Sequence, residues 1–161
     1  MERRSFLKQA GAGIAVGAAA APALASELPT IKWRLASSFP KTLDAIFGAS
    51  ETVAKRVAAA TGGKFQISLF AAGEIVPSPG VLDAVKDGTV ECGHTASYYF
   101  IGKDPTFAFD TAMPFGLNSR QHSAWLLSGG GLELIREFLK DYNIHNIPCG
   151  NTGTQMGGWF R

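Results

Sequence analysis

The chain has 161 residues, of which 46% are hydrophobic and 17% charged, a composition that argues against intrinsic disorder. Its formal net charge of +2 arises in the first eight residues, because the chain from Ser26 onward carries 12 basic and 12 acidic side chains. A neutral remainder has no basic surplus to neutralise phosphates, so the sequence predicts no nucleic-acid partner.

The N-terminal residues have the order of an export signal. The basic segment RRSFLK at 3–8 is followed by a weakly apolar stretch at 10–21 and by Ala23-Leu24-Ala25, an A-x-A cleavage pattern. RRSFLK also resembles the twin-arginine motif R-R-x-F-L-K of bacterial Tat signals. The apolar stretch is shorter than the ~20 residues that cross a bilayer. We expect 1–25 to be a cleavable Tat-type signal peptide; a disordered or helical N-terminal tail is the alternative.

Alternating apolar residues predict strands at 31–36 and 65–69, and a short apolar run predicts a third, buried strand at 90–94. Between the first two strands, a period near 3.6 from Leu43 predicts a helix, with Thr42 as its N-cap and Gly62-Gly63 at its end. Between the last two, Ser78 is the expected cap of a helix that Gly88 closes. This strand–helix alternation is typical of an α/β fold.

The second half of the chain is predicted to be mainly helical. One helix is expected from Asn118 or Ser119 to Leu127, and another from near Gly131. The carboxylates of the latter helix recur every four residues among basic side chains, which indicates a solvated face. Residues 144–149 have the pattern of a further strand, and 152–161 of a glycine-rich extended segment.

No enzyme signature is present in the sequence. It contains no G-x-S-x-G elbow, no phosphate-binding G-x-x-x-x-G-K-[ST] loop and no H-E-x-x-H motif. His94, His122 and His145 lack metal-ligand spacing, so each is expected to be a packed or solvated imidazole. An exported chain permits a disulfide between Cys92 and Cys149, but both lie in apolar contexts, where a reduced cysteine behaves as a small hydrophobe.

Two segments have the chemistry of a ligand site. Tyr98 and Tyr99 directly follow the third predicted strand, and ligands of open α/β sheets lie at the carboxyl ends of strands. Tyrosines there offer an apolar wall with hydroxyl donors, although packing beneath a loop is the alternative. In the glycine-rich segment, the amide of Gln155 could ligate a hard cation or donate to a carboxylate.

Several motifs, in order, resemble one protein family. They are KWRLASSFP at 32–40, AAGEIVP at 71–77, GHTASYY at 93–99, GKDPTFAF at 102–109 and QMGGWFR at 155–161. This part of the chain is similar to the solute-binding subunit of tripartite ATP-independent periplasmic (TRAP) transporters, of the DctP-like family. Within that family it most resembles the branch that binds 2-oxo acids such as pyruvate.

The resemblance implies a two-lobed, periplasmic-binding-protein-like α/β fold that closes on a small carboxylate and presents it to the TRAP membrane subunits. It implies that residues 26–150 are the N-terminal lobe and that 151–161 are the hinge or first strand of the second lobe. In the 2-oxo acid branch the tyrosine pair, here Tyr98 and Tyr99, lines the substrate pocket. The glutamine of Q-M-G-G-W, here Gln155, contacts substrate and a bound sodium ion.

The family's main carboxylate-clamping arginine follows the W-F-R motif, beyond Arg161. The chain is therefore expected to be a C-terminally truncated fragment with very weak affinity for a 2-oxo acid, because a bidentate guanidinium is the strong contact to a carboxylate. Arg34, Arg120 and Arg161 are substitute partners in principle, but surface ion pairs are the expectation for them.

The resulting hypothesis is a non-enzymatic periplasmic binding protein that delivers a 2-oxo acid, with sodium, to TRAP membrane subunits. No cofactor is expected, and a homodimer is considered only for a full-length protein. A Tat-exported periplasmic enzyme or redox partner with a bound cofactor is the rival hypothesis. A binding protein for a different carboxylate or carrier is a third.

Overall fold

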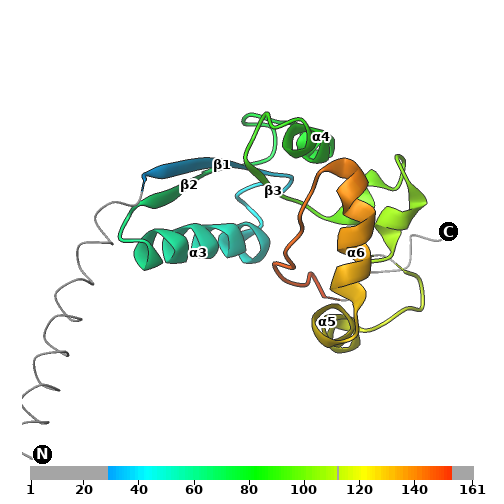
Figure 1. Ribbon diagram of the computed structural model, residues 1–161. Helices are drawn as coiled ribbons and strands as arrows, with labels where there is room; N and C mark the ends of the chain where they lie inside the picture. Colours follow the sequence, from blue (N-terminus) through cyan, green and yellow to red (C-terminus); the bar gives the residue numbers. More distant parts are fainter. Residues whose placement is uncertain (1–28, 112, 154–161) are drawn as a thin grey trace, which may run out of the picture. The chain divides into compact units, whose positions relative to one another are not determined.

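A computed structural model describes residues 29–111 and 113–153 of the chain (Figure 1). The chain divides into two units, Met1–Ile31 and Lys32–Arg161. The strands and helices of the described residues, in order, are β1 Ile31–Ser37, α3 Asp44–Ala60, β2 Phe65–Phe70, η1 Ser78–Gly80, α4 Val81–Lys86, β3 Cys92–His94, η2 Ser97–Phe100, η3 Pro105–Ala108, α5 Ser119–Ser128, α6 Gly131–Leu139 and η4 Lys140–Tyr142.

The strands form a sheet in the order β2-β1-β3, with β1 and β3 parallel and Ala36 in register with Gly93. Gly93 faces α4, since a Cβ built there would lie 2.6 Å from Cγ1 of Val81. The next residue, His94, points to the opposite face, where Nδ1 lies 2.6 Å from Oγ of Ser50 in α3. Side chains alternate along a strand, so α3 and α4 cover opposite faces of the sheet (Figure 1).

Two hydrophobic clusters form the core. The first lies between the sheet and α4, and its buried members are Ala36, Val76, Val81 and Val90. The second lies among the helices, and its buried members are Leu82, Phe100, Phe107, Ile135 and Leu139. Leu82 and Val81 are neighbours in α4, so this short helix contributes to both clusters.

Several predicted element boundaries are confirmed. Gly62 and Gly63 end α3 with φ of 55° and 78°, values that glycine adopts without steric cost. Helix α5 begins where a helix was expected, because Asn118 and Gln121 form a capping box: the Asn118 side chain accepts from the Gln121 backbone N–H, and the Gln121 side chain accepts from the Asn118 backbone N–H.

Two predicted N-caps are wrong. Helix α3 begins at Asp44 with Leu43 at its N-cap, which makes no side-chain capping bond, so Thr42 does not cap it. The Ser78 hydroxyl likewise caps no helix: it donates to the Ser38 carbonyl at 2.9 Å, 40 residues away in the sequence. A serine hydroxyl satisfies whichever acceptor the tertiary structure brings closest, and here that acceptor belongs to the end of β1.

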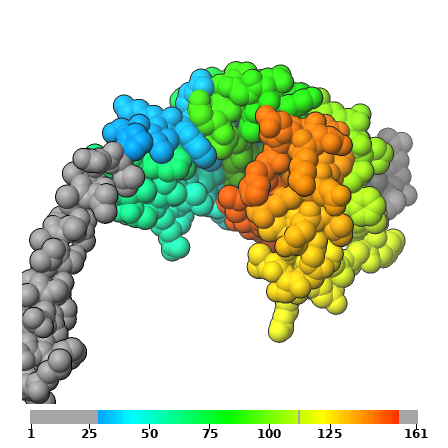
Figure 2. All heavy atoms as spheres, in the orientation of Figure 1, coloured from blue at the N-terminus to red at the C-terminus, as the bar shows by residue number. Residues whose placement is uncertain are grey.

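The strand predicted at 144–149 is not present in the structure. The Asn146 carbonyl accepts hydrogen bonds from the Arg136 guanidinium, at 3.3 and 3.0 Å, instead of from a neighbouring strand. Ile144 packs against the helical cluster. Figure 2 shows this segment, orange to red, lying against α6. An apolar alternation without an adjacent strand edge does not form a ladder.

The third strand is shorter and less buried than predicted. Its ladder covers Cys92–His94, and the residues there are half-buried to exposed, with Val90 buried just before it. Cys92 and Cys149 are free thiols; Cys92 is half-buried, whereas Cys149 is exposed and lies outside any strand, unlike the apolar context expected for it. Burial raises the pKa of the Cys92 thiol to about 11, so it stays protonated at neutral pH. No helix among the described residues is long and apolar enough to cross a membrane.

Candidate functional site

The carboxyl ends of β1 and β3 lie side by side, because the two strands are parallel and paired up to Ser37 and His94. The chain continues from β1 into Ser38 and Phe39, and from β3 into η2, which carries Tyr98 and Tyr99. This edge is where an open α/β sheet binds ligands. The tyrosine pair therefore lies at the strand edge that the sequence indicated.

The two tyrosine rings pack edge to face, with centroids 4.7 Å apart and planes at 72°. The Tyr99 ring also lies 6.1 Å from the ring of Phe39, which is buried. Tyr99 itself is 41% exposed. Partial burial, followed by the hydrogen bond with Tyr98, raises the pKa of the Tyr99 hydroxyl, so it remains a hydrogen-bond donor at physiological pH. The result is a partly exposed aromatic surface that carries two phenolic hydroxyls.

His94 lies behind this aromatic surface as a packed imidazole, as expected. Its ring centroid is 5.0 Å from that of Phe39, and its Nδ1 lies 2.6 Å from the Ser50 hydroxyl and 3.5 Å from the Ser37 hydroxyl. Burial lowers the pKa of His94, which favours the neutral ring. A neutral imidazole that accepts from Ser50 at Nδ1 carries its proton on Nε2. The contact ties the sheet edge to α3.

A pair of serines holds the loops at the same edge. The Ser38 hydroxyl donates to the Ser78 carbonyl and the Ser78 hydroxyl donates to the Ser38 carbonyl, both at 2.9 Å. The backbone N–H of Ser38 donates to the His94 carbonyl at 2.8 Å, and the hydroxyls of Ser38 and Thr95 are 2.7 Å apart. Ser38 is 5% exposed. The sequence analysis did not predict this pair of reciprocal hydrogen bonds. The available signal was the consecutive Ser37-Ser38 at the end of an apolar strand.

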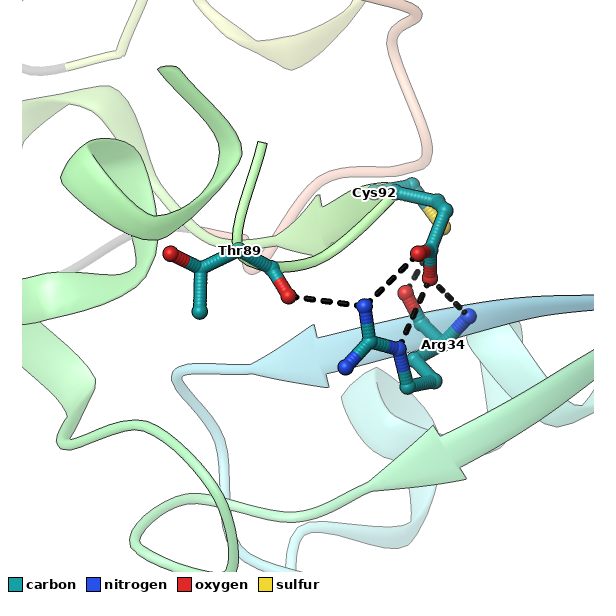
Figure 3. A network of polar contacts seen from close by, with 4 residues as sticks. Arg34, Thr89 and Cys92 are labelled. Carbon is teal, nitrogen blue, oxygen red and sulfur yellow. Dashed lines mark hydrogen bonds and ion pairs between the residues drawn. The ribbon is translucent and has the colours of Figure 1, made fainter. Parts of the chain in front are cut away.

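Arg34 is occupied by an ion pair away from the tyrosines. Its guanidinium contacts both carboxylate oxygens of Glu91, with Nη2–Oε1 at 2.7 Å and Nε–Oε2 at 3.1 Å, and also donates to the Thr89 carbonyl (Figure 3). The Arg34 guanidinium holds the pKa of Glu91 down at about 2. The expectation that Arg34 forms a surface ion pair is therefore confirmed. Arg120 is exposed and forms no ion pair within the described residues.

The remaining predicted ligand, Gln155, lies outside the described residues, as does Arg161. Within 29–111 and 113–153, no group of three or more His, Cys, Asp or Glu side chains is arranged to hold a metal ion. The carboxylates Glu133, Glu137 and Asp141 are exposed, as a solvated helix face requires.

Residues 36–160 match the model of the family described as bacterial extracellular solute-binding protein, family 7 (DctP). Over 134 residues the chain is 58% identical to a protein of Nostoc sp. named monocarboxylate 2-oxoacid-binding periplasmic protein, covering 83% of this chain and 36% of that protein.

Solved structures agree with this assignment. The fold is similar to that of a TRAP transporter solute-binding protein from Bordetella bronchiseptica with calcium and picolinate bound, at a TM-score of 0.78 and 53% identity, over 83% of this chain and 40% of that one. It is also similar to a TRAP periplasmic solute-binding protein from Pseudoalteromonas atlantica with sodium and pyruvate bound, at a TM-score of 0.76 and 42% identity, over 82% and 40% of the two chains.

The chain thus spans well under half the length of these relatives. Its mixed α/β fold corresponds to part of the N-terminal lobe of periplasmic solute-binding proteins. The match to the family model extends over most of the chain and includes the carboxyl ends of β1 and β3, beside which the tyrosine pair lies. The chain belongs to bacterial extracellular solute-binding protein family 7, the DctP family of TRAP transporter solute-binding proteins.

Proposed function

We propose that this chain supplies the N-terminal lobe of a non-catalytic solute-binding protein that captures a small 2-oxo monocarboxylate such as pyruvate. The observation that carries the proposal is the tyrosine pair at the shared carboxyl edge of β1 and β3, in which Tyr99 is exposed and Tyr98 half-buried. The names of the Nostoc and Pseudoalteromonas relatives, which specify a 2-oxo acid and pyruvate, support the ligand class. The bound acid is then delivered to TRAP membrane subunits.

In this proposal the aromatic faces of Tyr98 and Tyr99 shield the ligand from water, and their hydroxyls donate to its oxygens. Burial strengthens such hydrogen bonds because water no longer competes for the donor. Gln155 completes the polar contacts, with its amide on the acid and on an accompanying sodium ion; the sodium in the Pseudoalteromonas structure supports that pairing. Closure of a second lobe would complete the burial of the ligand.

The domain boundaries and the export route are parts of the same proposal. Residues 1–25 act as a Tat signal peptide, 26–150 form the lobe, and 151–161 form the hinge or first strand of the second lobe. The RRSFLK motif carries the Tat assignment. Replacing Arg3 and Arg4 together by Lys should block export to the periplasm, measured by fractionation. Unchanged export would reject the Tat route and leave the ligand proposal intact.

Ligand binding is tested by calorimetry with pyruvate, with and without sodium. Residues 26–161 replace the matching part of the Nostoc relative, to which the chain is 58% identical, so that the remainder of a family-length protein is present. The chimaera should bind pyruvate, whereas the 161-residue chain alone should bind it very weakly, because the resemblance places the carboxylate-clamping arginine after Arg161. A chimaera that binds no 2-oxo acid would overturn the proposal.

The tyrosine assignments are tested in the same chimaera. Tyr98→Phe and Tyr99→Phe should each weaken binding about tenfold, the cost of one lost hydrogen bond to a charged group. Tyr142→Phe is the matched control, because Tyr142 packs against Phe107 and Phe138 in the helical cluster. Equal affinities for all of these variants would reject the site while leaving the family assignment unaffected.

A further inference from the structure

Asp110 is a part-buried carboxylate that the proposed function does not use. It follows η3 and lines a small cavity with Ser97, Thr106 and Phe107, which α6 closes with Ile135, Phe138 and Leu139. One carboxylate oxygen, Oδ1, is inaccessible to solvent and has no hydrogen-bond partner in the structure. A carboxylate oxygen buried without a partner costs free energy, so a role for this side chain is worth seeking.

The other oxygen of Asp110 holds the start of the turn that carries the tyrosines. The Ser97 hydroxyl donates to Oδ2 of Asp110 at 2.6 Å. Ser97 is the first residue of η2, and Tyr98 and Tyr99 are the next two. The N-cap residue of η2, Ala96, makes no side-chain capping bond. The carboxylate of Asp110, 13 residues away in the sequence, is thus the side-chain anchor of the first residue of η2.

One of the backbone bonds at this turn is long, which leaves room for a side-chain anchor. The Ile101 N–H reaches the Tyr98 carbonyl at 3.4 Å and the Tyr99 N–H reaches the Ala96 carbonyl at 3.1 Å. Bonds of a 3₁₀ turn have poorer geometry than those of an α-helix. Small rotations of such a turn would move both aromatic rings, whose hydroxyls form the proposed ligand surface.

His122 of α5 is the titratable group that acts on Asp110. It interacts electrostatically with the carboxylate; its Nε2 is buried without a hydrogen-bond partner in the structure, and its ring stacks on Trp125 at 5.7 Å. The lining residues from η3 and α6 are uncharged. The hydroxyls of Ser97 and Thr111, and then His122, lower the pKa of Asp110 only in part. Burial dominates and raises that pKa.

We propose that Asp110 is a positioning residue for Tyr98 and Tyr99: by accepting from Ser97 it sets the orientation of η2 and hence of the ligand surface. The role in ligand binding rests on the proposed function above; the role in orienting the rings does not. Asn at this position keeps an acceptor oxygen for the Ser97 hydroxyl but carries no charge. Ala at this position removes the acceptor, so the hydrogen bond from Ser97 is lost.

The sign of the pH effect follows from the raised pKa. Folding favours the protonated carboxyl, so the stability that Asp110 contributes is present below the unfolded pKa and is lost as pH rises through the folded pKa. Asp110→Asn should remove this loss, making the variant at least as stable as the parent at neutral pH. Asp110→Ala should be less stable than Asp110→Asn at every pH, because only Asn preserves the bond to Ser97.

The decisive experiment is NMR of the tyrosine rings in the 161-residue chain. Asp110→Ala and Ser97→Ala should shift the ring signals of Tyr98 and Tyr99, whereas Asp110→Asn should leave them close to those of the parent chain. Asp87→Ala is the control: Asp87 is an exposed aspartate after α4, and its removal should leave the signals unchanged. When pH is varied, the ring signals of the parent chain should also change as Asp110 titrates. That change should be absent in Asp110→Asn, whereas any change caused by the titration of His94 should remain.

Ring signals that are unchanged in both Asp110→Ala and Ser97→Ala would overturn the positioning role. If Asp110→Ala does not fold, Ser97→Ala and the pH response of Asp110→Asn still decide it. In the chimaera, Asp110→Ala should weaken pyruvate binding about tenfold and Asp110→Asn should restore it. A parent chimaera that binds no pyruvate would reject the proposed function alone, because the ring signals report orientation without ligand.

Discussion

The hydrophobic cluster of the sheet and that of the helices are built from different side chains. The sheet cluster consists of alanine and valine, and these small residues let α4 approach Gly93 so closely that no Cβ fits between them. The helical cluster is built around three rings that pack on Phe107 with centroids 4.9 to 5.8 Å away. The sheet region is thus held by close backbone contact and hydrogen bonds, and the helical region by large aromatic surfaces.

The candidate site depends on both regions. Turn η2 leaves the sheet edge after β3, and its last residue, Phe100, is buried in the helical cluster. Tyr99, the residue before it, contacts Phe39 at the end of β1. The position of the tyrosines is therefore fixed at one end by strand pairing and at the other by aromatic packing. Substitutions in each region test this division.

The largest effect is expected for Phe107→Ala. Phe107 is 3% exposed, and truncating a buried phenylalanine costs about 3–5 kcal/mol, because the surrounding rings cannot collapse to fill the space. Urea unfolding measures the change in the free energy of unfolding. Phe109→Ala is the control, since that ring is 55% exposed and its removal should change stability by about 0.5 kcal/mol or less. Similar losses for the two would contradict the aromatic basis of the helical region.

Gly93→Ala tests the close packing of the sheet region. The new methyl group would lie 2.6 Å from Val81 Cγ1 and 3.1 Å from Val85 Cγ2, and overpacking of this kind costs about 1–3 kcal/mol. Gly131→Ala is the matched variant, with its methyl group 2.4 Å from the Trp125 ring. It should cost less, because Trp125 is only half-buried and can turn outward, whereas Val81 is fully buried. A larger loss for Gly131→Ala would reverse this ranking.

Ser38→Ala tests the hydrogen bonds at the sheet edge. It removes the bond to the Ser78 carbonyl and the contact with Thr95, and we expect a loss of about 1–2 kcal/mol in the free energy of unfolding, the cost of buried groups left without partners. Ser68→Ala on the exposed side of β2 is the control for removing a hydroxyl. If both serine variants lose the same stability, the hydrogen bonds of Ser38 do not stabilise this edge.

The smallest effect at neutral pH is expected for Glu91→Gln, because its ion pair with Arg34 is exposed and screened by salt. The effect should appear in acid. The pKa of Glu91 is lowered from 4.5 to about 2, so the pair stabilises the fold above pH 4.5, and that stability is lost as pH falls towards 2. Melting temperatures measured across this range should fall less steeply for Glu91→Gln than for the parent chain. Parallel profiles would show that the pair contributes nothing.

The sequence by itself was sufficient for elements whose determinants are local. The start of α5 after Asn118, the glycines that end α3 and the alternation in β2 all depend on residues close in sequence, and each is found where it was expected. The position of the tyrosine pair at the sheet edge was also predictable, because the pair directly follows a strand and parallel strands share a carboxyl edge. Local propensity acts within a few residues, whereas the shared edge also requires the pairing of β1 with β3.

The tertiary structure decided everything that depends on distant partners. Residues 144–149 have the alternation of a strand, but the Arg136 side chain occupies the Asn146 carbonyl. Ser78 has the spacing of a helix cap, but its hydroxyl bonds to Ser38. His94 meets Ser50 across 44 residues. A polar side chain binds whichever partner the fold brings within 3 Å, and that choice depends on packing between elements, which no short stretch of sequence encodes.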